Sequence, residues 1–150
     1  MSGPVTFKIQ GLSEMDEALG EFSKATAKNI LKRVGKAALV PMADLAQSLA
    51  PKLTGQLRDS ITEGTKLTSR QARLAKQDDN PSFTTIYMGP NDPAAIPQEF
   101  GTFDQPAQPF MRPAFAQEAE ATIRRVADGL KPEIDKAAAR ARAKALKATK

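Results

Sequence analysis

The chain has 150 residues, of which 41% are hydrophobic and 26% charged, and its formal net charge is +5. It contains no Cys and no His, which excludes disulfides, thiol nucleophiles, Cys/His zinc sites and imidazole catalysis. No apolar run approaches the roughly 18 residues that a membrane span needs, and the N-terminus lacks a signal-peptide pattern. We therefore expect a single, non-secreted domain with a mainly aliphatic core and no membrane partner.

The positive charge is concentrated at one end of the chain. Residues 131–150 hold seven basic and two acidic side chains, whereas residues 1–130 hold 15 of each. We accordingly divide the chain into one domain over residues 1–132 and a basic, Ala/Lys/Arg-rich helical extension over residues 133–150. Such an extension is either a solvated helix or a contact for nucleic acid or an acidic partner. The side chains available for that contact are Arg140, Arg142, Lys144 and Lys147.

Hydrophobic spacing predicts the elements of the first half. Residues 5–9 alternate between apolar and polar, which indicates a short first strand. Apolar residues then recur every three or four positions, which predicts one helix from about 13 to 26, with Ser13 as its N-cap, and a second from about 27 to 49. Pro41 should kink or restart the second helix, and a single long bent helix is the alternative.

The second half combines a hairpin with a final helix. Residues 60–67 and 83–89 read as strands, joined by a long exposed loop at 68–82. After Pro113 an apolar stripe beginning at Phe115 predicts a core-facing helix that breaks near Gly129 and Pro132. The order predicts an α+β fold, with a small antiparallel sheet packed against a long kinked N-terminal helix pair and a C-terminal helix.

The stretch from Ala95 to Phe115 is both aromatic and proline-rich, with four Phe and four Pro. Pro disfavours strand and helix interiors, and Phe is costly to expose, so we expect an ordered loop anchored by its own Phe side chains. Glu99 and Asp104 are its candidates for acid–base or metal chemistry. Nothing else converges on them, so we expect no enzyme, no cofactor and no small-molecule substrate. Glu99 should instead accept hydrogen bonds from neighbouring backbone N–H groups or pair with Arg112, within a subunit or across subunits.

Three motifs follow one another along the chain. The first, A-P-x-x-T-G-x-L-x-x-S-I, runs from Ala50 to Ile61; the second is E-F-G-T; the third, P-A-x-P-F-x-R-P-A, runs from Pro106 to Ala114. The fixed positions of the first motif include Pro51, Thr54, Gly55, Leu57 and Ser60, and those of the second are Glu99, Phe100, Gly101 and Thr102. In this order the motifs resemble the phage tail-component or neck protein family typified by gene product ten of the lambdoid phage HK97, over roughly residues 7–135.

The resemblance implies a structural protein of a long-tailed phage virion, without catalytic residues or cofactors. Such proteins are expected in the neck or tail-completion layer, as rings that are often hexameric and that join the head connector to the tail tube. The partners it implies are copies of the chain itself, adjacent neck, connector, tail-tube or tail-terminator proteins, and DNA in the channel, with assembly in the host cytoplasm. A tail terminator, or a nucleic-acid-binding accessory protein acting through the basic extension, are the alternatives.

A ring subunit needs a contact loop that is ordered before it meets its neighbour, and Pro and Phe both limit the entropy lost on binding. The aromatic stretch is the predicted interface. We expect Phe100 and Phe110 in the core, and Phe103 and Met111 at the contact. The full set is Glu99, Phe100, Gly101, Thr102, Phe103, Pro109, Phe110, Met111, Arg112 and Pro113.

Overall fold

The computed structural model describes residues 12–52, 55–74 and 84–149. The predicted strand at 5–9, Thr54 and the second half of the predicted 68–82 loop lie outside the described residues. Within the described ranges, no helix combines the length and the apolar character needed to cross a membrane.

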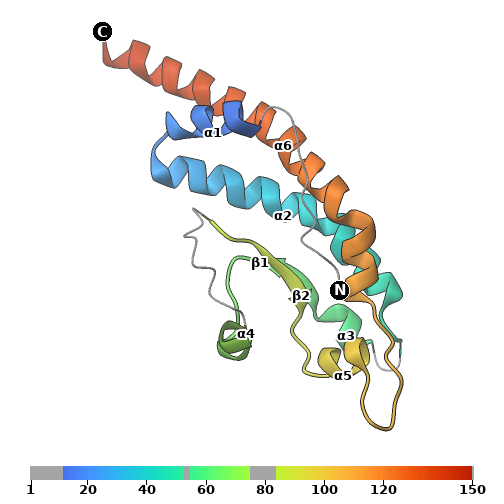
Figure 1. The fold of residues 1–150 in the computed structure, drawn as a ribbon. Coiled ribbons are helices and arrows are strands. Elements are labelled where there is room, and N and C mark those ends of the chain that lie inside the picture. Colours follow the sequence, from blue (N-terminus) through green and yellow to red (C-terminus); the bar gives the residue numbers. More distant parts are fainter. Residues whose placement is uncertain (1–11, 53–54, 75–83, 150) are drawn as a thin grey trace.

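Two long antiparallel helices dominate the molecule (Figure 1). They are α2 (Lys24–Leu49) and α6 (Met111–Ala148); α1 (Leu12–Gly20) covers one end of the pair, and the hairpin of β1 (Ile61–Gly64) and β2 (Tyr87–Pro90) lies against α2. In the hairpin Ile61 faces Pro90 and Gly64 faces Tyr87. The remaining elements are α3 (Gln56–Asp59), α4 (Ser69–Leu74) and α5 (Ala95–Phe100). The α+β class with a small antiparallel sheet is confirmed.

The chain turns between the first two helices at residues 21–23, earlier than the predicted boundary. Ser23 is the N-cap of α2, and its hydroxyl oxygen accepts a hydrogen bond from the Thr26 N–H at 3.3 Å. The predicted cap, Ser13, lies inside α1, so that prediction is wrong. Ser23 satisfies one of the orphan N–H groups at the start of α2, which fixes where this helix begins.

Both long helices contain a proline that was expected to disturb them: Pro41 was expected to kink or restart α2, and Pro132 to break α6 near Gly129. The α2 helix continues through Pro41, and α6 continues through Gly129 and Pro132, so the predicted break there is wrong. Each proline removes one intrahelical hydrogen bond, but the residues four positions earlier, Ala37 and Asp128, are exposed, so water can satisfy their carbonyls. The glycine allows close packing: a Cβ added at Gly129 would lie 2.8 Å from Val34 Cγ1.

The strands are shorter than predicted, and helices occupy two segments expected to be irregular. Ser60 is the C-cap of α3, so β1 begins one residue later and ends at Gly64. Part of the predicted 68–82 loop forms α4, and the start of the aromatic stretch forms α5. The antiparallel pairing itself is confirmed.

The described core has two parts. One, where α1 covers α2 and α6, is centred on Leu19, Ile30, Val34 and Leu130. The other lies where α2 ends and α6 begins. Along the predicted stripe of α6, Ala119 and Leu130 are buried, but Phe115 is 54% exposed, so its assignment to the core is wrong. Members of the second part are Met42, Ala43, Ala46, Ala50, Leu57, Ile61, Ala95, Phe110, Ala114 and Ala119.

Candidate interface at the loop between α5 and α6

Glu99, in α5, caps the start of α6 from a different helix. One carboxylate oxygen, Oε2, accepts hydrogen bonds from the N–H groups of Phe110 (2.8 Å) and Met111 (2.9 Å). The other, Oε1, accepts from the Arg112 N–H at 3.0 Å and from its Nε at 2.9 Å. The N-cap residue of α6, Phe110, makes no side-chain cap of its own. A carboxylate at a helix N-terminus satisfies orphan donors and interacts favourably with the helix dipole.

The Arg112 side chain also connects the end of α5 to the start of α6, on the solvent-exposed side. Its Nη2 donates to the Glu99 carbonyl oxygen at 2.7 Å, and its guanidinium carbon lies 5.0 Å from the centre of the Phe100 ring. The expected bonding of Glu99 to backbone N–H groups and to Arg112 is confirmed, and it lies within one chain. Phe100 is 66% exposed, so its assignment to the core is wrong. It lies on the outer face of α5, where Arg112 makes a cation–π contact with it.

Gly101 allows the loop to fold back on α5. Its φ of 79° is in the left-handed region, and its N–H donates to the Pro97 carbonyl at 2.8 Å. A Cβ at Gly101 would lie only 2.8 Å from the Ala107 backbone nitrogen. The Gln108 N–H then donates to the Gln98 carbonyl at 2.8 Å, which connects the returning half of the loop to α5. Glycine is required here by both its φ and the close approach of the backbone.

The loop tip is a closed turn with an exposed aromatic ring. The Thr102 N–H donates to the Gln105 carbonyl at 2.8 Å, and the Gln105 N–H donates to Thr102 Oγ1 at 3.1 Å. Between them Phe103 is fully exposed, with a relative accessibility of 103%. The base is therefore held by buried and partly buried hydrogen bonds, while the tip carries a ring that contacts little of its own chain.

The carboxylates Glu99 and Asp104 do not form a common site. Glu99 is 5% exposed and its two oxygens already accept four hydrogen bonds, whereas Asp104 lies exposed at the tip. In the part of the chain that the structure describes, no group of three or more acidic side chains could hold a metal ion. Burial opposes ionisation of Glu99, but the N–H groups of Phe110, Met111 and Arg112 and the Arg112 side chain outweigh it. They hold the pKa of Glu99 below its usual value of 4.5.

This lowered pKa predicts an acid-sensitive fold. The ionised Glu99 contributes its stabilisation at pH values above 4.5, and we expect that contribution to be lost as the pH falls through the lower pKa of the folded state. In urea unfolding at a series of pH values, the free energy of unfolding should therefore decline less steeply below pH 4.5 for Glu99→Gln than for the unmodified chain. Parallel declines in the two proteins would show that Glu99 does not have a lowered pKa.

The three sequence motifs meet in one part of the core. Leu57 and Ile61 of the first motif pack in the same buried cluster as Phe110 and Ala114 of the third, and Phe110 and Ala114 are completely buried. The second motif supplies the Glu99 cap that joins α5 to α6. The motifs therefore brace the loop, and the prediction that Phe110 is a core residue is confirmed.

The first motif also anchors the segment that leads to α5. Gly55 has a φ of 76° before α3, and the Ser60 hydroxyl donates to the Leu57 carbonyl at 2.7 Å while accepting from the Asp92 N–H at 3.2 Å. Pro51 is half-buried just after α2. The Ser60 hydrogen bond therefore connects the end of α3 to the segment before α5.

The structure distributes the remaining predicted interface residues between core and surface. Met111 is half-buried and packs against the core cluster, which limits what it can offer to a neighbour. Pro109 is exposed, and Pro113 is half-buried in the first turn of α6, where a missing N–H costs little. Ile96 was not among the predicted interface residues, but it is exposed on α5 one helical turn before Phe100. The four-residue spacing of these two apolar residues was the available signal.

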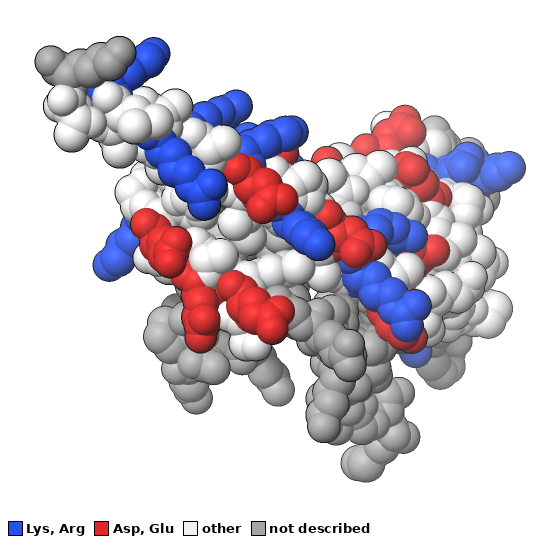
Figure 2. Space-filling model, turned by 90° about the horizontal axis from the view of Figure 1, so that it is seen from above, with Lys and Arg blue, Asp and Glu red and all other residues white. Residues whose placement is uncertain are grey.

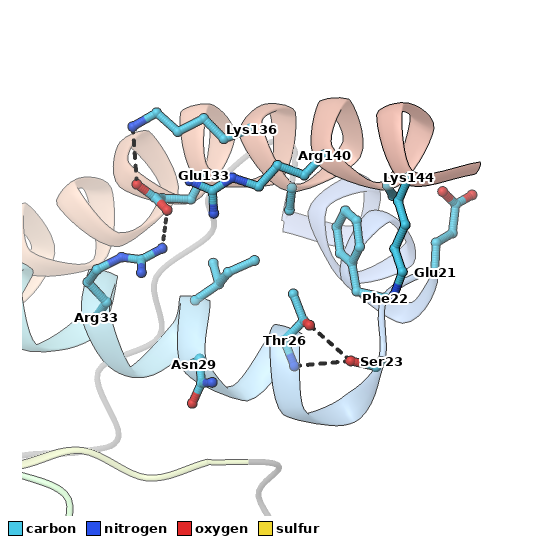
Figure 3. A pocket seen from close by; sticks show the side chains of 13 residues that line it. Glu21, Phe22, Ser23, Thr26, Asn29, Arg33, Glu133, Lys136, Arg140 and Lys144 are labelled. Carbon is cyan, nitrogen blue, oxygen red and sulfur yellow. Dashed lines mark hydrogen bonds and ion pairs between the residues drawn. The ribbon is translucent and has the colours of Figure 1, made fainter. Parts of the chain in front are cut away.

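The basic extension forms the last turns of α6. Arg140, Arg142, Lys144 and Lys147 are all exposed, on an end of the helix that extends beyond the body (Figures 1 and 2). Between this end and the start of α2 lies a groove of about 510 Å³ (Figure 3). Its charged lining residues are Glu21, Arg33, Glu133, Lys136, Arg140 and Lys144.

Comparison with known proteins identifies the class of this chain, which matches a family of bacteriophage proteins. The matching family model is described as "Bacteriophage HK97-gp10, putative tail-component" and covers residues 13–101, more than half of the chain, so the chain belongs to this family of phage tail components. The match includes the first motif and the first three residues of the second; Thr102, the third motif, α6 and the basic extension lie beyond it. No curated protein and no solved structure matched the chain.

Proposed function

We propose that the chain is a structural subunit of the phage virion, forming a ring in the neck or tail-completion layer that joins the head connector to the tail tube. The observation that carries this proposal is the exposed Phe103 at the tip of a loop whose base is held by Glu99 and Arg112. Such a loop loses little conformational entropy on association, and an aromatic side chain supplies a large buried area. Membership of the tail-component family supports a place in the virion.

The proposed contact surface consists of Ile96, Phe100 and Phe103. All three are exposed, and they lie on α5 and the loop that follows it. Neighbouring exposed apolar side chains are typical of interaction sites. We propose that a second copy covers this surface, because a contact between two different surfaces of one chain, repeated around an axis, closes a ring. Six copies around a DNA channel is the arrangement that we propose.

We also propose that the chain has no enzymatic activity and needs no cofactor. The sequence has no Cys or His, and Glu99, the buried carboxylate of the loop, is committed to capping α6. These features leave the loop a role in contact between proteins.

Phe103→Ser provides the test of the contact. We expect it to leave the free energy of unfolding within about 0.5 kcal/mol of the unmodified value, because the ring touches little of its own chain. It should nevertheless block the joining of heads to tails, counted by electron microscopy in lysates in which the variant complements a deletion of the gene. The matched control is Val40→Ser, which also removes an exposed apolar side chain but from α2. Normal yields of joined particles with Phe103→Ser would contradict the proposal.

Two alternatives keep the same fold but change the partner. A tail terminator would use a similar ring on the tail tube, and only its position in the particle would differ. An accessory nucleic-acid-binding role is favoured by the exposed basic end of α6. Deletion of residues 136–150 would then remove DNA binding that falls steeply with salt. Unchanged DNA affinity and assembly after this deletion would exclude a role of the extension in either.

A further inference from the structure

The basic end of α6 is not covered by the described part of the chain. Between Lys136 and Lys147 there are five basic side chains and no acidic one. All residues from 139 to 149 are exposed, and Figure 1 shows this end of α6 extending past α1 and α2. The end of the helix is therefore a cationic surface that a partner can reach.

The neighbouring α1 carries the opposite charge. Residues 12–23 contain four acidic side chains and no basic one. All four are exposed, and the spacing of Glu14 and Glu17 places them on one face of α1. In Figure 2 acidic side chains gather beside the projecting helix, which itself carries Lys and Arg. The four acidic residues are Glu14, Asp16, Glu17 and Glu21.

Neither charged surface is neutralised by the other within the described ranges. Five ion pairs are found there. Arg33 pairs with Glu133 and Arg112 pairs with Glu99, and the other three, Arg124–Glu120, Arg125–Glu118 and Lys136–Glu133, lie within α6. None of them includes an acidic residue of α1 or a basic residue after Lys136. Both surfaces are thus able to form ion pairs with another molecule.

The groove shows where carboxylates would bind. Glu133 already pairs with Arg33 and, at 3.5 Å, with Lys136 (Figure 3). Arg140 and Lys144 line the same groove with Phe22, and neither is in an ion pair among the described residues. A carboxylate of a second copy that entered here would meet these two cations beside the Phe22 ring, next to this chain's own Glu21, which also lines the groove.

We infer that the basic end of α6 in one copy docks on the acidic α1 of a second copy, with carboxylates of α1 contacting Arg140 and Lys144. The inference rests on the proposed ring of copies and names a second contact within it. A DNA partner would account for the basic surface only, whereas a second copy accounts for the basic and the acidic surface together. Complementary charge on two surfaces speeds the encounter of the two copies and disfavours other orientations, in which like charges would meet. Because the two surfaces differ, the contact can be repeated around an axis to close a ring.

Two charge reversals in the full chain test this docking. One variant carries Arg140→Glu with Lys144→Glu, and the other carries Glu14→Lys with Glu17→Lys. The control reverses an exposed ion pair elsewhere on α6, with Glu120→Lys and Arg124→Glu. Only variants whose circular dichroism spectrum matches that of the unmodified chain, and which are therefore folded, are compared. Sedimentation velocity, at salt from about 0.05 M to about 0.5 M, measures self-association.

We expect the unmodified chain and the control to associate at low salt and to dissociate as salt is raised. Each reversal alone should weaken association by about tenfold or more, since like charges then face each other. Mixing the two variants, or combining all four substitutions, should restore it, which a simple loss of folding would not allow.

Other outcomes separate this inference from the proposed function. An unmodified chain that stays monomeric at low salt, or reversals that associate normally, would overturn the docking, while the particle assay with Phe103→Ser still tests the ring. Association that stops at two copies would support the docking and contradict the ring. If the α6 reversal loses binding to a short DNA duplex but keeps self-association, the partner is DNA and the inference is wrong.

Discussion

Replacing Glu99 with alanine is expected to lower the free energy of unfolding by roughly 2–4 kcal/mol. The substitution removes the acceptor for the N–H groups of Phe110, Met111 and Arg112, and it leaves the Arg112 guanidinium without its carboxylate. Glu99 is almost completely buried, so water cannot easily replace it at the N–H of Phe110. Urea unfolding near neutral pH, where Glu99 is ionised, measures the difference.

Two comparisons isolate the capping role of Glu99. Glu120→Ala removes an exposed carboxylate that pairs with Arg124 on the surface of α6, and it should cost about 0.5 kcal/mol or less. Arg112→Ala keeps all three backbone hydrogen bonds of Glu99 and should cost clearly less than Glu99→Ala. A Glu99→Ala protein as stable as Glu120→Ala would show that α6 does not depend on this cap.

Replacing Phe110 with alanine is expected to cost roughly 3–5 kcal/mol of unfolding free energy. The ring is completely buried in the cluster that contains Leu57, Ile61 and Ala114, so the substitution leaves a cavity where the three motifs meet. The matched control is Phe103→Ala, which removes the same ring from a fully exposed position and should cost less than about 0.5 kcal/mol. Equal losses for the two variants, measured by urea unfolding, would contradict the division of the loop into a buried base and an exposed tip.

Periodic patterns in the sequence were sufficient to predict the long helices and the hairpin. The alternation around Ile61 and Tyr87 reflects the two faces of a strand, and the apolar steps along α2 and α6 reflect one buried face of each helix. The predicted break at Gly129 was wrong because the reason for that glycine is the approach of Val34 from α2. Such a contact between distant segments leaves no local pattern.

The aromatic stretch shows the same limit at the candidate site. Its Phe and Pro content indicated an ordered loop. Pro97 was read as evidence against a helix, but a proline in the first turn of a helix is well tolerated, and Pro97 lies in the first turn of α5. Composition also could not distinguish Phe100, on the outer face of α5, from Phe110, in the core. The bond between Glu99 and Arg112 was predictable as a charge pair. Its role as the cap of α6 required knowing that α5 ends beside the start of α6.

The structure changes which residues of the motifs are candidates for binding. Glu99, Gly101, Phe110 and Arg112 hold the base of the loop together, so substitutions there would disturb folding and contact at once. Phe103 is the residue whose removal separates the two effects. The contact is therefore best examined at the loop tip and at the basic end of α6, where charge and shape can be altered with little effect on the core.

A cryo-electron microscopy reconstruction of the head–tail junction in the assembled particle tests the proposed function most directly. We predict a closed ring of this chain around the channel, between the head connector and the tail tube, with Phe103 of each copy buried against its neighbour. A junction without this chain, or a ring in which the loop from Gly101 to Phe110 faces solvent on every copy, would contradict the proposal.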